Sequence, residues 1–353
     1  MGKRLETRLK FKRFLFYILR SVRRFLGRNK TVYAEERVEE YRGYWEEGAR
    51  LLGAEFVPLT DSLWEVRLDG RHTRIKLWMV QLGDPVVNRI AGDKVLCYQW
   101  ATRLGVPVPQ HLVFRLDELP KAKEFLRENR GVYVVKPTSG TSSGVGISTH
   151  IRTVQQLENA AVSASLFADE LLLERMIFGE TCRLLWLGRE LIHAVRRRGV
   201  RVTGDGRSTI GQLLARQGLG QVPFDLTAQM TLEAQGLSRD AVPENGREIL
   251  VRSLPAGESA RHELRTVYNE TITHLIAPAM IEEIRPLLAA IENEIAGVDI
   301  VTNNPSVSLQ ESGGVMLEVN PGPGIHHHYI SPQDRGPNAV AVKVLKYLLR
   351  ATN

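Results

Sequence analysis

Short apolar runs and stretches of helical apolar spacing follow one another along most of the chain, with turn residues between them. Apolar residues at intervals of three and four predict helices, and short alternating or continuous apolar runs predict strands. The predicted helices cover residues 36–52, 91–104, 117–129, 154–164, 278–295 and 339–350. The predicted strands cover 55–59, 63–68, 73–80, 132–136, 171–174, 191–195, 297–301 and 315–320. This order predicts a mixed α/β fold, with a less regular insertion over 215–261.

A loop of small residues follows the strand that ends at Lys136, and Val145, Ile147 and Ser148 are interpreted as a returning strand. Two short strands joined by such a loop predict a hairpin with a movable tip. Backbone N–H groups of small residues can surround an anion closely, and Lys136 would add a positive charge. A solvated turn is the alternative interpretation. A Walker loop is excluded, because no Gly-Lys-Ser/Thr sequence opens a helix here.

A second candidate site combines oxygen-bearing side chains on two apolar strands. Glu318 and Asn320 are two residues apart, so on a strand both side chains face the same way. Asp299 lies in the apolar run 297–301. Carboxylate and amide oxygens are the hard ligands that Mg²⁺ prefers, with substrate phosphates completing its coordination. The alternative is a buried polar set that bonds only to the backbone.

Residues 1–30 differ from the rest of the chain in charge. They hold eleven lysines and arginines against one glutamate, a net charge of +10, whereas the whole chain carries +7, so residues 31–353 carry −3. Apolar residues recur at helical spacing, which predicts a basic amphipathic helix. Such a helix suits an anionic membrane surface. It suits equally well a packing role on the protein's own body or on another subunit, and nucleic acid or another polyanion is the least favoured partner.

Overall composition is that of an ordinary globular protein, with 43% apolar and 25% charged residues. Two cysteines, Cys97 and Cys182, give no disulfide framework and fit a reducing compartment. No secretory signal or membrane-spanning apolar run is recognised. The predicted location is the cytoplasm, with peripheral association at the inner membrane face as an option for residues 1–30.

The motifs, taken in order, resemble those of the ATP-grasp carboxylate–amine ligases. The sequence AGDKVLCYQWATRLGVPVPQ resembles the family's lysine-bearing helix and the strand entry after it, and VVKPTSGTSSGVGIS resembles its second lysine and glycine-rich lid. LLLERMIFGETCRLLWLGRELIHAVRRR resembles the adenine hinge and the strands beyond it, and GVDIV and MLEVNPGPG resemble the metal-binding strands. The segments VTGDGRSTIGQLL and PGPGIHHH are closest to the branch that contains cyanophycin synthetase and related peptide ligases; D-alanine–D-alanine ligase is more distant.

The resemblance implies an ATP-grasp fold in four segments. Residues 1–30 form the basic helix and 31–90 a small N-terminal α/β lobe. Residues 91–168 form the small ATP-grasp lobe with the lid, and 169–353 the large lobe with the metal-binding strands.

The resemblance also implies roles for individual residues, residue by residue. The ATP contacts are Lys94, Lys136, the lid residues Gly140, Ser142, Ser143 and Gly144, the hinge residues Glu174, Arg175, Met176 and Ile177, and Glu180. The catalytic arginine that neutralises the transferred phosphoryl group is Arg196 or Arg197, and the metal ligands are Asp299, Glu318 and Asn320. The branch usually has Asp at the position of Thr181, so either Glu180 replaces this ribose-binding carboxylate or the carboxylate is missing.

The implied activity is ATP- and Mg²⁺-dependent joining of a carboxylate to an amine through an acyl phosphate, with Mn²⁺ as an alternative ion. Amino acids or peptides are the expected substrates, and a homo-oligomer is the expected assembly. Two other hypotheses are a non-catalytic nucleotide-binding or membrane-associated protein and an ATP-grasp kinase. The run His326-His327-His328 suggests zinc, but neighbouring histidines point in different directions, which disfavours a shared ion. His328 remains a candidate for contact with substrate or for support of the site.

Overall fold

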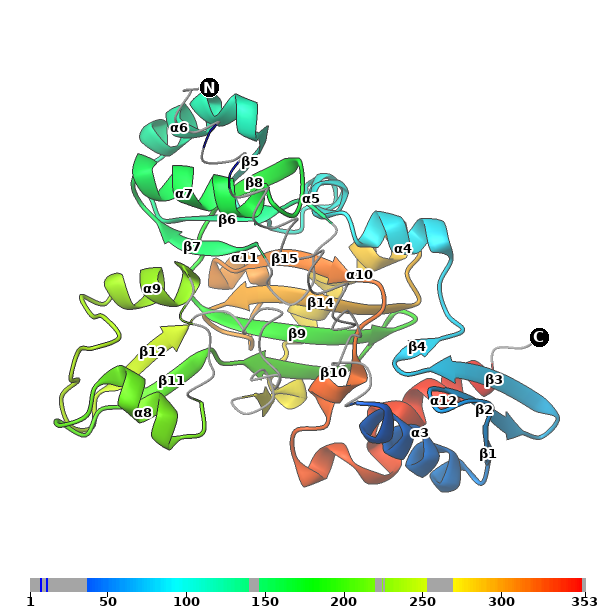
Figure 1. Cartoon of the computed structure of the whole chain (residues 1–353). Helices are drawn as coiled ribbons and strands as arrows, with labels where there is room; N and C mark the ends of the chain where they lie inside the picture. The colour runs from blue at the N-terminus through cyan, green and yellow to red at the C-terminus, as the bar shows by residue number, and fades with distance from the viewer. Residues whose placement is uncertain are drawn as a thin grey trace. The chain divides into compact units, whose positions relative to one another are not determined.

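The computed structural model describes residues 37–139, 146–219, 226–252 and 269–350, together with Thr7, Phe11 and Phe224. The predicted lid residues Gly140, Ser142, Ser143 and Gly144 lie outside the described residues, as does nearly all of the basic N-terminal segment. The chain forms two compact units, and Figure 1 labels most of the helices and strands that compose them. Unit 1 contains the described parts of Pro109–Ile177 and Arg198–Tyr268, and unit 2 those of Thr31–Val108, Phe178–Arg197 and Asn269–Asn353. Each unit combines segments that are distant in sequence, so the four contiguous segments expected above remain a prediction.

The centre of unit 2 is a five-stranded antiparallel sheet in the order β13-β10-β9-β14-β15. Its strands are β9 (Glu180–Leu187), β10 (Glu190–Arg197), β13 (Glu270–Thr271), β14 (Ile295–Thr302) and β15 (Val315–Asn320). Strand β14 is buried along its whole length, as expected for a central strand that is covered on both faces.

A smaller antiparallel sheet and two helices complete the main core of unit 2. The elements are α3 (Val38–Leu52), β1 (Glu55–Pro58), β2 (Leu63–Leu68), β3 (Arg71–Lys76), β4 (Met79–Val80) and α12 (Val340–Arg350). Trp45, Trp64 and Leu345 belong to one buried cluster that also includes Leu185 of β9. The predicted strand 73–80 is interrupted at Leu77, whose φ is 57° and whose carbonyl accepts a hydrogen bond from the Trp45 indole.

Two helices of unit 2 differ from the prediction most clearly, each at one end. The remaining elements are α4 (Pro85–Ala91), α5 (Lys94–Arg103), η2 (Thr273–Leu275), α10 (Pro278–Ile291), α11 (Leu309–Ser312), η3 (Ile325–His328), η4 (Pro332–Asp334) and η5 (Gly336–Asn338). The predicted helix 91–104 begins only at Lys94, because Asp93 is its N-cap and accepts from two backbone amides of the first turn. The predicted helix 278–295 ends at Ile291, and Ile295 already belongs to β14.

Unit 1 contains a four-stranded antiparallel sheet in the order β5-β8-β6-β7, with two helices against it. The elements are β5 (His111–Arg115), η1 (Leu116–Glu118), α6 (Leu119–Glu128), β6 (Tyr133–Pro137), β7 (Ser148–Ile151), α7 (Val154–Ala164) and β8 (Glu170–Arg175). Leu126 of α6 and Leu157 of α7 share a buried cluster with Val135 and Leu173 of the strands. The returning strand of the hairpin begins at Ser148, later than predicted.

The rest of unit 1 contains the strands β11 (Val200–Thr203) and β12 (Glu248–Arg252), which pair with each other, and the helices α8 (Ile210–Arg216) and α9 (Leu226–Glu233). Helix α9 and strand β12 lie inside the segment 215–261 that was predicted to be less regular. Helix α9 contributes Met230 to the core of the four-stranded sheet and Leu232 to the core around β11 and β12. In the described part of the chain, no helix has both the length and the apolar character needed to cross a membrane.

Candidate active site

The carboxylates predicted as metal ligands lie on one face of the unit 2 sheet. Asp299 of β14 is directly opposite Glu318 of β15 on one side and Arg183 of β9 on the other. Directly opposed residues of neighbouring strands project from the same face of a sheet. The three side chains therefore form a row across three strands.

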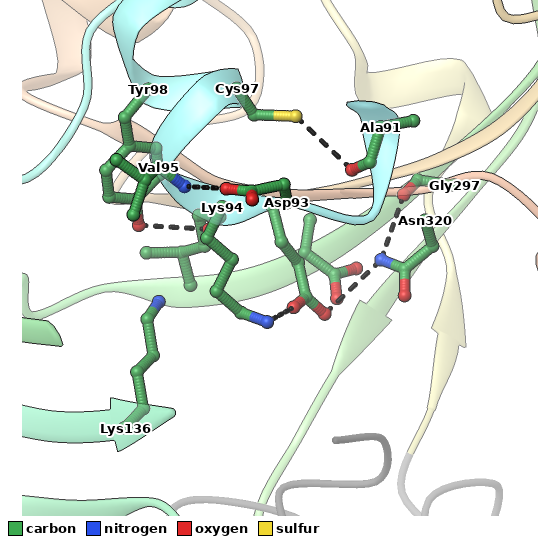
Figure 2. A network of polar contacts seen from close by, with 12 residues as sticks. Ala91, Asp93, Lys94, Val95, Cys97, Tyr98, Lys136, Gly297 and Asn320 are labelled. Carbon is green, nitrogen blue, oxygen red and sulfur yellow. Dashed lines mark hydrogen bonds and ion pairs between the residues drawn. The ribbon is translucent and has the colours of Figure 1, made fainter. Parts of the chain in front are cut away.

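The two predicted ligands on β15 share this face, as their spacing predicted. The Asn320 side-chain amide donates to the carbonyl of Gly297 at 3.1 Å and to Glu318 Oε1 at 3.3 Å. Lys94, the first residue of α5, forms an ion pair of 3.2 Å with Glu318 Oε2 (Figure 2). Lys94 is thus placed beside a predicted metal ligand by the Asp93 cap that starts the helix.

Two guanidinium groups hold Asp299. Arg183 contacts both of its oxygens, with a distance of 2.7 Å from Nη2 to Oδ2, and Arg197 Nη1 lies 3.2 Å from Oδ2. The Arg183 guanidinium has room at this position only because Gly297 lacks a side chain. A Cβ at Gly297 would lie 2.8 Å from Arg183 Nη1. A carboxylate has about four lone-pair positions, so Asp299 keeps acceptor capacity for another cation.

The strand register separates the two candidate catalytic arginines. Val195 of β10 is opposite Arg183, so Arg197, two residues later, lies on the face that carries Asp299 and Glu318. Arg196 is opposite Cys182 on the other face, where it pairs with Glu180 at 3.1 Å and Glu270 at 3.7 Å. The geometry brings Arg197 to the predicted metal ligands, and it places Arg196 and Glu180 together on the reverse face.

Unit 1 contains a second, simpler ion pair. Lys136 of β6 lies 2.8 Å from Glu174 of β8, and the side chains are 6% and 5% exposed. Beyond Glu174, the amide of Arg175 donates to Gln110 and the amide of Met176 donates to Val132. Two of the backbone donors of the predicted adenine hinge are therefore already used within unit 1.

Sequence analysis missed a buried histidine cluster in unit 2. His193 of β10 lies 3.0 Å from His328 of η3 through their Nδ1 atoms, and its Nε2 lies 2.9 Å from Asp334. Burial lowers the pKa of both histidines below the ordinary value, and the Arg183 and Arg197 charges add to this effect at His328. His326 contacts the Tyr41 hydroxyl instead, so the three consecutive histidines have different partners. The pattern Ser331-x-x-Asp334, a capping box in the structure, was an available signal for Asp334.

The thiols are poor candidates for nucleophiles. Burial raises the pKa of Cys97 to about 12, and the Asp93 charge adds to the effect. Burial likewise raises the pKa of Cys182 to about 12, with a further contribution from Glu180. Neither side chain would ionise at neutral pH.

The chemistry of the donor set fits Mg²⁺. Among the described residues, no three His, Cys, Asp or Glu side chains gather as a metal site. Two carboxylates and one amide, Asp299, Glu318 and Asn320, are the partial oxygen set expected for an ion that completes its coordination with water and phosphates.

Comparison with known proteins gives relatives in two groups. No protein-family model matches the chain. It is 29% identical over 295 residues to the cyanophycin synthetase of Trichormus variabilis, covering 78% of this chain and 31% of the relative. It is 26% identical over 227 residues to the glutathione biosynthesis bifunctional protein GshAB of Clostridium perfringens, covering 60% of this chain and 28% of that protein. The chain therefore spans about a third of the length of these curated relatives.

One solved structure shows the same fold over most of the chain. The bifunctional glutathione synthetase from Pasteurella multocida superposes with a TM-score of 0.53 at 19% identity, covering 86% of this chain and 43% of that one. The order of the sequence motifs, the curated relatives and the shared fold agree with one another. The fold is therefore the ATP-grasp fold that the motifs predicted.

Proposed function

We propose that the protein is an ATP- and Mg²⁺-dependent ligase that joins a carboxylate to an amine through an acyl phosphate. A carboxylate oxygen of the first substrate attacks the γ-phosphorus of ATP, and the bond to ADP breaks. The amine then attacks the acyl carbon, phosphate leaves with the C–O bond electrons, and the amine loses a proton.

The observation that carries this proposal is the row of charges on one face of the unit 2 sheet. Asp299 and Glu318 lie opposite each other, Asn320 follows on the same face, and Lys94 and Arg197 pair with the two carboxylates. Such a set provides both hard metal ligands and cations for a phosphoryl group. Bound Mg²⁺, held by Asp299, Glu318 and Asn320, would neutralise phosphate charge.

The residues of the chain have separate tasks in this proposal. Lys94 binds phosphate once the nucleotide competes for its charge, since its present partner Glu318 has a side chain that is 30% exposed. Arg197 stabilises the charge that develops on the transferred group, because charge-assisted bonds are strongest where water is excluded. In unit 1, Lys136 and the backbone at Met176 and Ile177 are the proposed nucleotide contacts.

The substrate class rests on the relatives alone. Their names, cyanophycin synthetase and glutathione biosynthesis bifunctional protein, indicate peptide-like products. We infer that the carboxylate and the amine are carried by amino acids or short peptides. Oligomer formation and association of residues 1–30 with an anionic membrane surface remain predictions.

The test is ADP release from the purified full-length protein with ATP, Mg²⁺ and pools of amino acids and short peptides, followed by mass spectrometry. A ligase gives pool-dependent turnover and a product lighter by one water than its two reactants. A phosphorylated product without amine incorporation would instead support an ATP-grasp kinase. Nucleotide binding without turnover in any pool would favour the non-catalytic alternative.

A further inference from the structure

In the buried histidine cluster of unit 2, hydrogen bonds link Asp334, His193 and His328 in a chain. This chain determines which ring nitrogen of each histidine carries a proton. Asp334 accepts from the amide of Ser331, from the Thr271 hydroxyl at 3.0 Å and from His193 Nε2 at 2.9 Å. Burial opposes ionisation of this carboxyl, but these donors keep the pKa of Asp334 below the ordinary value. An ionised carboxylate only accepts hydrogen bonds, so His193 must carry its proton on Nε2.

The next hydrogen bond fixes the second histidine. With its proton on Nε2, a neutral His193 offers a lone pair on Nδ1. The contact of 3.0 Å to His328 Nδ1 then requires His328 to donate from Nδ1. His328 is left with a lone pair on Nε2, and among the described residues this fully buried nitrogen has no hydrogen-bond partner.

The surroundings of His328 are cationic. Along β10, His193 and Arg197 project from the same face as Val195, and Arg183 lies opposite Val195, so His193 shares this face with both arginines. The charges of Arg183, Arg197 and His326 disfavour protonation of His328, and that of Lys343 disfavours protonation of His193. Of the two rings, His193 is the one that hydrogen-bonds to the Asp334 carboxylate. A protonated His328 would add a further positive charge beside two guanidiniums that already share Asp299. A neutral His328 instead presents an acceptor to them.

We propose that Asp334, His193 and His328 form a buried relay that keeps His328 as a neutral acceptor beside Arg183 and Arg197, and that His328 is a positioning residue for these guanidiniums. If Asp299 bound a metal ion, the guanidinium N–H groups that now contact it would need another acceptor to keep their orientation. The Nε2 lone pair of His328, which no described residue occupies in this structure, would then be that acceptor. This role rests on the proposed function for its effect on turnover, but not for the protonation pattern itself.

The protonation pattern is tested without any substrate. Histidine ring ¹⁵N NMR of the full-length protein, assigned with single histidine variants, distinguishes a protonated from an unprotonated ring nitrogen. We expect His193 to be protonated on Nε2 and His328 on Nδ1 at neutral pH. A proton on His328 Nε2 would overturn the proposal.

Two substitutions separate positioning from packing. In His328→Asn, the amide replaces Nδ1 and keeps the donor to His193, but nothing replaces Nε2. In His328→Gln, the longer amide reaches the Nε2 position with an acceptor oxygen and loses the Nδ1 donor. The variant His72→Asn, at an exposed histidine, is the control.

The two His328 variants should rank in opposite orders for nucleotide affinity and for thermal stability. His328→Gln keeps the affinity for the Mg²⁺ complex of a non-hydrolysable ATP analogue within about threefold by calorimetry, whereas His328→Asn loses about tenfold, as for one charge-assisted hydrogen bond. Thermal unfolding shows the opposite order, with Asn the more stable variant. Where turnover is measurable, His328→Asn lowers kcat more than it raises KM for ATP.

If nucleotide affinity simply followed stability in these variants, the positioning role of His328 would be contradicted. Failure of the wild-type protein to bind the analogue would overturn the proposed function, and the NMR measurement would still decide the protonation pattern.

Discussion

Unit 1 and unit 2 each hold carboxylates beside cations, but they do so in different ways. In unit 1, Lys136 and Glu174 form an ion pair in which both side chains are about 95% buried. In unit 2, Asp299 pairs with Arg183 and Arg197. Its neighbour Glu318, which is partly exposed, pairs with Lys94. The first arrangement is electrically neutral, and the second has one positive charge in excess.

This difference in exposure and charge determines how readily each group of side chains can bind an added ion or phosphate. A neutral buried pair gains little from an added ion, and removing one partner leaves an uncompensated charge. An open network with an excess cation attracts an anion, and its exposed carboxylate can exchange a lysine for a metal ion. The comparison predicts that substitution of Lys136 lowers stability more than substitution of Lys94 does, in addition to any loss of nucleotide binding at Lys136.

The largest expected effect is the loss of turnover in Glu318→Ala. Removing this carboxylate takes away a proposed Mg²⁺ ligand, and we expect the rate of phosphate release to fall by about 10³-fold or more. The protein should stay folded with a lower midpoint of unfolding, because the substitution leaves the buried Lys94 without its ion-pair partner. Glu282→Ala, at an exposed glutamate that pairs with Arg285, is the matched control. Full activity in Glu318→Ala would falsify the metal assignment.

The next effect is on stability, in unit 1. Lys136→Met leaves the Glu174 charge buried without its cation, and the free energy of unfolding should fall by about 3–5 kcal/mol. Lys94→Met should cost about 1 kcal/mol or less, because Glu318 can turn to water. Denaturant unfolding measures both values.

A double substitution sharpens this test. Lys136→Met with Glu174→Leu removes both charges and should recover most of the lost stability. Equal losses in the Lys136 and Lys94 variants would show that the two regions do not differ as described.

The two faces of the unit 2 sheet give a smaller contrast. Arg197→Ala should lower the rate of phosphate release by about 10²-fold, as for loss of one charged donor to a transition state. Arg196→Ala should lower it by less than about tenfold, because its partners Glu180 and Glu270 lie on the other face. Steady-state kinetics at saturating ATP compares the two variants directly. A larger loss in Arg196→Ala would reverse the assignment of the catalytic arginine.

Sequence alone predicted what depends on local periodicity. Glu318 and Asn320 share a face because side chains alternate along a strand, and α7 and β15 lie where the apolar pattern placed them. The end of α10 was misplaced because Ile291 and Ile295 continue the helical spacing without a glycine or proline between them. Helix propensity gives way here to the pairing of Ile295 with Leu187.

The residues that sequence could not place depend on register between distant strands. Choosing between Arg196 and Arg197 requires knowing that Val195 lies opposite Arg183. The partners of His193 are 135 and 141 residues away, and no periodicity connects them. Pairing of Lys136 with Glu174 has the same origin, because β6 and β8 are neighbours only in the folded sheet.

The smallest expected effect is the pH dependence of stability, and it again contrasts the two units. His193 and His328 in unit 2 and His150 in unit 1 are buried, and burial lowers each pKa below the ordinary value of 6.5. As pH falls below 6.5, these histidines bind protons in the unfolded chain but stay neutral in the folded chain, so the free energy of unfolding decreases. Each such histidine contributes a slope of about 1.4 kcal/mol per pH unit within its window. Asp334, whose pKa is also lowered, adds a loss only below its ordinary value of 3.8.

Denaturant unfolding between about pH 7.5 and about pH 5 measures this slope. His150→Asn should remove one histidine's share without other damage, because asparagine tolerates the positive φ of 59° at this position. His193→Asn should likewise remove one histidine's share, because it takes away one buried imidazole whose pKa is lowered by burial. An unchanged slope in His193→Asn would mean that this histidine is already protonated in the folded protein. Unit 2 would then carry yet another cation beside its arginines, and its charge excess would need a different explanation.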